Sequence, residues 1–195
     1  MITLALVGMG KWGINFLGAA EKVNDCRLKY ICVHKSADLV PSGYVKVVGH
    51  KNLNKYSDIQ GVIIATPAKT HYQIAKDLLM QNYHLLIEKP LTTDYQQAAK
   101  LAQLQQKKKV QVLMGHTYLY HPTYKRARTQ IERIGVIKQI EFVGYNARKL
   151  KKGLSCLWEW GPHGVILVRD LMGKNPTAVT AWMQEREKVL LSLRF

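Results

Sequence analysis

Cysteine is scarce in this sequence, which contains only Cys26, Cys32 and Cys156 among its 195 residues. Their number is odd and their spacing is not that of a zinc site, so we expect neither a disulfide framework nor a bound metal. Long apolar runs are also missing, because no stretch approaches the ~20 residues needed to span a bilayer. The N-terminus lacks the basic segment and small-residue cleavage site of a signal peptide. These absences favour a cytoplasmic protein without a membrane segment.

Acidic residues are in the minority, since 13 Asp and Glu stand against 29 Lys and Arg and give a net charge of +16. Such an excess can attract anionic ligands or nucleic acid. Part of it lies in residues 107–109, at the end of a predicted helix, where cations favour the helix dipole and face solvent. Nucleic-acid binding rests on charge alone, and we do not expect it.

Apolar segments of strand length alternate with segments of helical periodicity over the first 118 residues. This alternation predicts βαβ units with right-handed crossovers and a parallel sheet. The expected fold is therefore α/β, a Rossmann sheet with helices on both faces. The predicted strands are residues 2–7, 27–33, 44–48, 61–65, 84–88 and 110–114, and the predicted helices follow residue 10 and span 70–79 and 94–106.

The pattern changes near residue 118. A helix, a strand, a second helix and two more strands are expected there, an order that resembles the beginning of an α+β domain. We therefore divide the chain into a Rossmann dinucleotide-binding domain, residues 1–118, and a partial α+β domain for substrate binding and oligomerisation, residues 119–195. The elements predicted in the second domain are residues 122–134, 136–145, 158–172, 178–182 and 189–195.

A glycine motif follows the first predicted strand and opens a helical segment. Gly8, Gly10 and Gly13 form the pattern G-x-G-x-x-G, with Lys11 and Trp12 between the last two glycines. The glycines permit a tight turn and let the backbone approach a pyrophosphate, which the helix N-terminus stabilises. After a strand and before a helix, the motif predicts a dinucleotide site.

The position expected to bind the adenosine ribose carries no acid. An Asp or Glu is usual about 20 residues after the glycines, whereas this chain has Lys35 and Ser36 there and no carboxylate before Asp38. A basic residue and a hydroxyl suit a 2′-phosphate, which favours NADP over NAD. The alternative is that Lys35 only caps an exposed loop, so both cofactors stay open.

A second polar motif ends the fifth predicted strand, where an apolar run is followed by Glu88, Lys89 and Pro90. Ligands of open α/β sheets bind beyond the carboxyl ends of the strands, and a proline keeps the residue before it extended. The motif is therefore expected at the reaction site, with a plain charged turn as the alternative.

Taken in order, these motifs resemble the Gfo/Idh/MocA family, named for glucose–fructose oxidoreductase and inositol dehydrogenase. The resemblance runs nearly end to end, and its last two segments are similar to the branch that acts on sugars carried on nucleotides. The second domain is shorter than is usual in the family. The resembling segments are residues 8–13, 65–67 with 70–72, 88–90, 115–122 and 157–163.

The resemblance implies hydride transfer between a nicotinamide ring and a sugar carbon. The family's lysine that contacts both substrate and nicotinamide corresponds to Lys89, whose ammonium can stabilise an alkoxide. The family's late acid and histidine correspond to Glu159 and His163, which are four residues apart and would share one side of a helix. His163 is then the expected general base, and Glu159 orients it or holds a sugar hydroxyl.

Further positions carry roles implied by the same resemblance. Thr66, Pro67, His71 and Glu88 fall where the family lines the dinucleotide, although His71 alone would also suit a helix surface. Contacts to the substrate are expected from Tyr118 and Arg148, with a solvated loop as the alternative for Arg148.

Two departures from the family leave a second function open. The family usually has Asp where this chain has Glu159, and a displacement of about 1 Å can cost ~10²-fold in rate. The short second domain would also leave residues 189–195 as an apolar edge strand, which needs a cover. We therefore expect a homo-oligomer through this sheet, and the alternative to a sugar oxidoreductase is an inactive dinucleotide-binding module.

Overall fold

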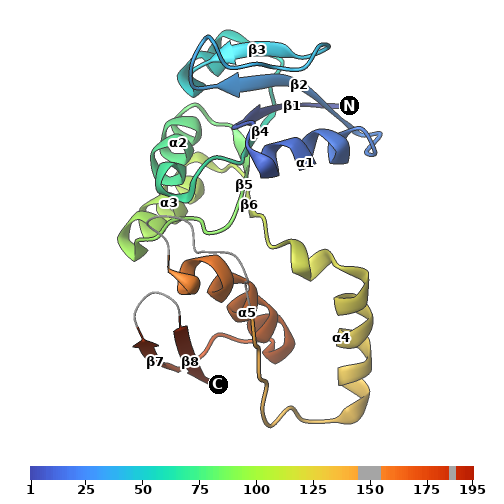
Figure 1. The fold of residues 1–195 in the computed structure, drawn as a ribbon, viewed down its shortest axis with the longest axis vertical. Coiled ribbons are helices and arrows are strands. Elements are labelled where there is room, and N and C mark those ends of the chain that lie inside the picture. Colours follow the sequence, from blue (N-terminus) through green and yellow to red (C-terminus); the bar gives the residue numbers. More distant parts are fainter. Residues whose placement is uncertain (145–154, 185–187) are drawn as a thin grey trace. The chain divides into compact units, whose positions relative to one another are not determined.

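The computed structural model describes residues 1–144, 155–184 and 188–195, which form two compact units, Met1–Gly115 and His116–Phe195 (Figure 1). The basic run at residues 148–152, and with it Arg148, lies outside the described residues. Within them, no helix is long and apolar enough to cross a membrane.

The first unit is built on a six-stranded parallel sheet with the order β3-β2-β1-β4-β5-β6. Its central strands are almost continuously apolar, as expected where both faces are covered. Each predicted strand is present, with bounds that differ by no more than two residues. The strands are β1 (Ile2–Val7), β2 (Cys26–Val33), β3 (Val45–Val48), β4 (Gly61–Ile64), β5 (His84–Ile87) and β6 (Val112–Met114).

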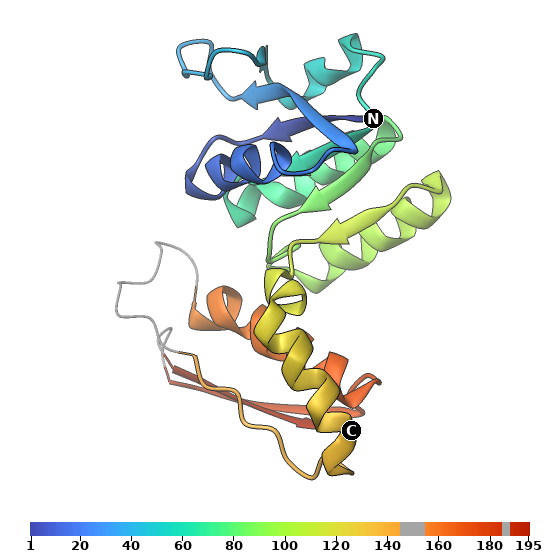
Figure 2. The same cartoon turned by 90° about the vertical axis from the view of Figure 1, so that its right-hand side faces the viewer.

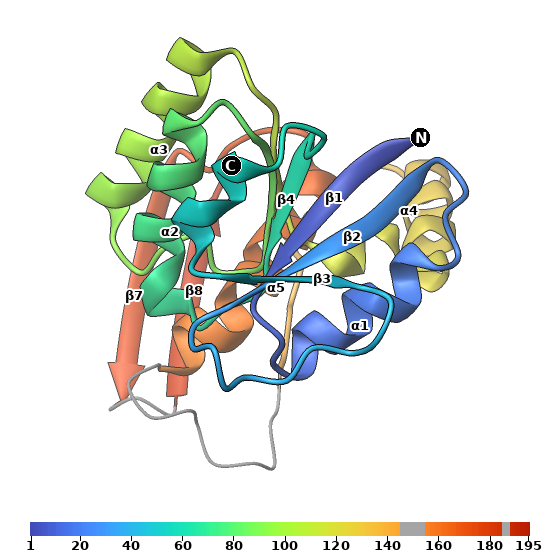
Figure 3. The same cartoon turned by 90° about the horizontal axis from the view of Figure 1, so that it is seen from above.

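Helices cover both faces of this sheet, which confirms the predicted α/β Rossmann fold (Figure 3). On one face α1 (Lys11–Ala20) packs Phe16 and Leu17 against Leu6 and Ile63. On the other face lie α2 (Ala68–Met80) and α3 (Tyr95–Lys108), together with the 3₁₀ segment η1 (His50–Lys55).

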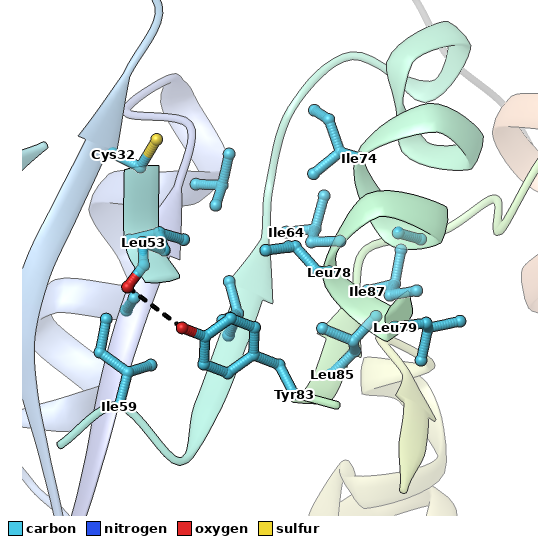
Figure 4. Close-up of a cluster of buried hydrophobic side chains, with 14 of the residues drawn as sticks. Cys32, Leu53, Ile59, Ile64, Ile74, Leu78, Leu79, Tyr83, Leu85 and Ile87 are labelled. Carbon is cyan, nitrogen blue, oxygen red and sulfur yellow. Dashed lines mark hydrogen bonds between the residues drawn. The ribbon is translucent and has the colours of Figure 1, made fainter. Parts of the chain in front are cut away.

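The larger core lies between the sheet and α2 (Figure 4). Leu78 and Leu79 of α2 are fully buried with Ile64 and Ile87 of the sheet. Burying each such side chain stabilises the fold by roughly 1.5–3 kcal/mol. At the rim of this core the Tyr83 hydroxyl donates a 3.1 Å hydrogen bond to the Leu53 carbonyl, which satisfies its polar atom inside an apolar environment.

The second unit combines helices with a two-stranded antiparallel sheet (Figure 2). Two side chains of α4 meet one acid of α5: the Tyr124 hydroxyl donates to Asp170 Oδ2 over 2.6 Å, and Arg128 Nε lies 3.0 Å from the same oxygen. The elements are η2 (Thr117–Tyr120), α4 (Pro122–Ile134), α5 (Cys156–Met172), β7 (Ala178–Gln184) and β8 (Lys188–Arg194).

The prediction of a strand at residues 136–145 was wrong for the residues that the structure describes. Residues 136–144 form no regular element, and residue 145 lies outside the described residues. Alternating apolar residues indicate a two-sided segment, but a strand also needs a hydrogen-bonded neighbour, and the small sheet of the described chain contains only β7 and β8. The segment instead packs on α5. Phe142 Cδ1 lies 2.5 Å from where a β-carbon on Gly164 would be, so a side chain there would have to displace the Phe142 ring.

Candidate active site

The three glycines of the first turn are required for different reasons. Gly8 has a φ of +102°, and a β-carbon on it would lie 2.9 Å from the Ala65 carbonyl oxygen. Gly13 is buried and packs directly on the Gly8 carbonyl. Gly10 is exposed, and a β-carbon there would meet nothing within 4 Å. Gly8 and Gly13 therefore shape the turn, whereas Gly10 leaves the backbone open to a ligand.

The N-terminus of α1 is suited to an anion. Gly10 is its N-cap and provides no side-chain hydrogen bond, and the first turn contains no acidic residue. Lys11 and Trp12 are exposed beside it. Backbone N–H groups and the positive end of the helix dipole favour negative charge at such a place. Together with the open backbone at Gly10, these residues fit the pyrophosphate of a dinucleotide.

Neighbouring strands bring the glycine turn and the Glu88–Pro90 motif to one edge of the sheet. Val7 pairs with Ile64, which pairs with Ile87, so β1, β4 and β5 end at the same level. The ladder continues beyond the strands, since Glu88 N–H donates to the Ile64 carbonyl over 3.0 Å. Lys89 follows half-buried, and its peptide bond to Pro90 is cis.

The Glu88 carboxyl group is only 7% exposed. Its Oε2 accepts a 3.2 Å hydrogen bond from the Lys89 backbone N–H, and no donor of the described chain reaches its Oε1. Burial raises the pKa of Glu88, because the low-dielectric surroundings disfavour the charged form. Gly115 makes room for this group, since a β-carbon there would lie 3.1 Å from the carboxyl atoms.

His71 is buried rather than exposed on the helix surface, which excludes that alternative. Its ring is 1% exposed. Nδ1 lies 2.8 Å from the Pro90 carbonyl oxygen, and Nε2 lies 2.8 Å from the Thr66 carbonyl oxygen. Thr66 is half-buried, and its hydroxyl oxygen accepts a 2.8 Å hydrogen bond from the Thr70 hydroxyl. The ring thus connects the segments that follow β4 and β5.

The expected 2′-phosphate position lies in an exposed loop after β2. The backbone N–H of Lys35 donates a 2.9 Å hydrogen bond to Asp38 Oδ2, and the Lys46 ammonium donates to the Ser36 carbonyl. These contacts fix the backbone of the loop while the side chains of Lys35 and Ser36 stay exposed. The loop can therefore present a cation and a hydroxyl.

The second unit gathers a different group of side chains around His163. Residues Glu159 and His163 lie one turn apart on α5, and His163 is buried at 8% exposure. The Tyr118 ring meets the imidazole edge-on at 4.6 Å between centroids, and the Trp160 ring lies at 6.0 Å. Among the described residues, no group of three or more His, Cys, Asp or Glu could hold a metal ion.

Two residues near these sites were not predicted from the sequence. Gly115, which leaves space for Glu88, could have been noticed as a glycine directly after a strand. Trp160 stands three residues before His163 on α5, and this helical spacing could have indicated the contact between the two rings. The other predicted residues that the structure describes lie in or beside the elements expected for them, whereas Arg148 lies outside the described residues.

The comparisons with known proteins agree with this geometry. Residues 2–116 match the model of the Gfo/Idh/MocA oxidoreductase family, described as having an NAD-binding Rossmann fold. The chain belongs to this family. The resemblance inferred from the motifs is therefore confirmed at the level of the family, whereas the nucleotide-sugar branch stays a prediction.

Three relatives illustrate the range of the family. The rhizopine catabolism protein MocA of Rhizobium meliloti is 26% identical over 89% of this chain and 58% of its own length. The UDP-N-acetylglucosamine 3-dehydrogenase of Acidithiobacillus ferrooxidans is 32% identical over 37% of this chain and 23% of its own length. The crystal structure of a putative oxidoreductase from Magnetospirillum magnetotacticum MS-1 is 30% identical and has a TM-score of 0.85. This match covers 100% of this chain and 67% of that protein's chain.

The chain thus spans little more than half of the MocA protein that it matches, 58% of its length. The family and the NAD-binding Rossmann fold are established for this chain, whereas substrate and catalysis are argued below as proposals.

Proposed function

We propose that this family member binds NAD or NADP and transfers a hydride between the nicotinamide ring and a carbon of a sugar, with nucleotide-linked sugars as the favoured class. The observation that carries the proposal is the common edge of β1, β4 and β5, which holds both the glycine turn and Lys89. In open α/β sheets this edge is where ligands bind. The family supports an oxidoreductase, and the UDP-N-acetylglucosamine 3-dehydrogenase among the relatives supports a sugar substrate.

The glycine turn and α1 would hold the pyrophosphate, with Thr66, Pro67 and Glu88 lining the rest of the dinucleotide. When bound, the nicotinamide would supply the acceptor or donor of the hydride. The exposed Lys35 and Ser36 favour a 2′-phosphate, and therefore NADP. The absence of a carboxylate at these two positions supports the same preference.

Lys89 is the proposed electrostatic catalyst. Its place two residues after the end of β5 puts an ammonium at the ligand-binding edge of the sheet. A cation there polarises a sugar hydroxyl and stabilises the oxygen as its proton leaves. The buried Glu88 beside it has a raised pKa, because its low-dielectric surroundings disfavour the charged form.

His163 is the proposed general base and Glu159 its orienting acid. A histidine titrates close to working pH and can accept the proton of a sugar hydroxyl. The edge-on contact with Tyr118 fixes one side of the imidazole. Tyr118 also offers a hydroxyl for the substrate, and Arg148 is retained as a proposed contact to a nucleotide phosphate.

The first experiment is a titration of the full chain with NADH and NADPH, followed by cofactor fluorescence. We expect binding of both, with NADPH tighter. Binding of neither would contradict the proposal at its base.

The second experiment is turnover on a panel of nucleotide sugars. Lys89→Ala and His163→Ala should each reduce turnover at least 100-fold while changing cofactor affinity less than about threefold, because their proposed roles act on the substrate hydroxyl. Lys107→Ala, at an exposed lysine near the end of α3, serves as the matched control. An equal loss of turnover in all three variants would contradict the proposed catalytic roles of Lys89 and His163.

A second function, dinucleotide binding without catalysis, is distinguished by the same pair of experiments. Tight cofactor binding with no turnover on any sugar would favour it. Homo-oligomer formation through the sheet of the second unit and a cytoplasmic location stay predictions, and light scattering on the purified chain tests the former.

A further inference from the structure

The ring of His71 faces two hydrogen-bond acceptors. Both neighbours are backbone carbonyl oxygens, one from Thr66 and one from Pro90, each 2.8 Å from a ring nitrogen. A carbonyl oxygen can accept a hydrogen bond but cannot donate one. The ring is 1% exposed, so water does not replace either partner.

A neutral imidazole cannot satisfy both contacts. It carries one N–H donor, and its other nitrogen presents a lone pair. One of the two contacts would then bring a lone pair against a carbonyl oxygen at hydrogen-bond distance. Only the imidazolium, which carries both N–H groups, donates to Thr66 and Pro90 together. Hydrogen bonds of this kind, with a charged donor, are also the stronger ones.

Burial opposes a positive charge, and so does the position of His71 in the first turn of α2, near the positive end of the helix dipole. The two carbonyl dipoles act in the opposite direction, because their negative ends point at the ring. The geometry is thus that of a ring held between two acceptors on two loops that carry proposed site residues.

We propose that His71 is a positioning residue for Lys89, and that its doubly protonated ring clamps the segment after β4 to the segment after β5. The Pro90 carbonyl belongs to the residue directly after Lys89, so fixing it fixes where Lys89 leaves the strand. The Thr66 carbonyl belongs to the segment proposed to line the dinucleotide. This inference rests on the proposed function for its effect on turnover, whereas the protonation of the ring does not depend on turnover.

The protonation is tested by ¹⁵N NMR of the histidine rings of the full chain at pH 7.5, with His71→Gln used to assign the signals. We expect both His71 nitrogens to show the chemical shifts of N–H groups, and neither to show that of a bare imidazole nitrogen. A signal from one unprotonated nitrogen would overturn the proposal. This readout stands whether or not the chain turns over a sugar.

The positioning is tested by His71→Leu, which removes both donors. We expect kcat to fall about 10- to 100-fold, since a misplacement near 1 Å at a reaction site can cost ~10²-fold. The dissociation constant for NADPH should rise by a smaller factor than kcat falls, because the clamp holds the segment proposed to line the dinucleotide as well as Lys89. Asp94→Ala is the control, because it removes a helix cap on α3 outside the proposed site.

A purely structural histidine would behave like the control, with a lower unfolding temperature and kcat unchanged per folded molecule. That result, or parallel losses of kcat and NADPH affinity, would overturn the positioning role. If the unaltered chain shows no turnover on any sugar, the proposed function fails, and the NMR result still decides the state of the clamp.

Discussion

The carbonyl group of Gly8 occupies the space that a side chain on Gly13 would need. The two residues pack the start of α1 onto the end of β1 without any intervening atom. Gly10 lies between them in sequence but has open space at its β-carbon position. The motif therefore separates into glycines that shape the turn and one that keeps the backbone accessible.

This separation predicts opposite effects for two alanine substitutions. Gly13→Ala should destabilise the chain by about 1–3 kcal/mol, because the added methyl group overlaps backbone atoms. Gly10→Ala should change stability by less than about 0.5 kcal/mol, yet weaken NADPH binding at least tenfold, because the methyl group lies where a pyrophosphate approaches the backbone. Urea unfolding and fluorescence titration measure the two effects. Unchanged affinity in a folded Gly10→Ala variant would place the dinucleotide elsewhere.

The buried Glu88 predicts a pH-dependent contribution to stability. Burial raises its folded-state pKa above the ordinary value of 4.5. Below pH 4.5 the carboxyl is protonated in both states; as the pH rises through the folded-state pKa, the unfolded chain ionises first and stability is lost. Glu88→Gln cannot ionise, so the free energy of unfolding of the unaltered chain should fall relative to this variant as the pH rises above 4.5.

Urea unfolding across that pH range checks the expectation. Glu141→Gln is the matched control, because Glu141 is exposed, and its difference from the unaltered chain should stay nearly constant with pH. A constant difference for Glu88→Gln as well would show that the carboxyl ionises as easily in the folded chain as in the unfolded one.

Asp94 caps α3, since its Oδ1 accepts a 2.8 Å hydrogen bond from the Gln97 backbone N–H. Asp94→Ala should lower the free energy of unfolding by about 1 kcal/mol, whereas Asp94→Asn, which keeps an oxygen acceptor, should cost only a few tenths. Thermal unfolding distinguishes them. Equal losses in the two variants would mean that the negative charge, and not the cap, provides the stability.

The side chain of Lys35 is expected to determine whether the chain prefers NADPH or NADH. Lys35→Met should weaken NADPH binding about 10- to 100-fold, the worth of one hydrogen bond to a charged group, and leave NADH binding unchanged. Lys107→Met changes the net charge equally at another exposed lysine. A similar loss with Lys107→Met would indicate a long-range effect of charge, and an equal loss for NADH would contradict the 2′-phosphate contact.

Local patterns predicted most of the fold of the first unit. Continuous apolar runs mark strands covered on both faces, and the glycine turn and Glu88–Pro90 motif identify the edge where a ligand binds. Contacts between distant segments were not predictable in this way. The Pro90 carbonyl that His71 meets lies 19 residues along the chain, and nothing near either residue reveals the pairing. The prediction of a strand at residues 136–145 was wrong for the same reason. A strand needs a neighbouring strand to form hydrogen bonds with, and the periodicity of a segment does not indicate whether such a neighbour exists.

The contact between α4 and α5 has a consequence for how the second unit opens. None of the α4 side chains that the structure describes is buried, and two of them, Tyr124 and Arg128, converge on the single carboxylate of Asp170. A helix with little buried apolar area opens at low free-energy cost. Loss of the Asp170 side chain would therefore weaken the attachment of α4 at two points together, whereas the packing of α5 against Phe142 does not involve this aspartate.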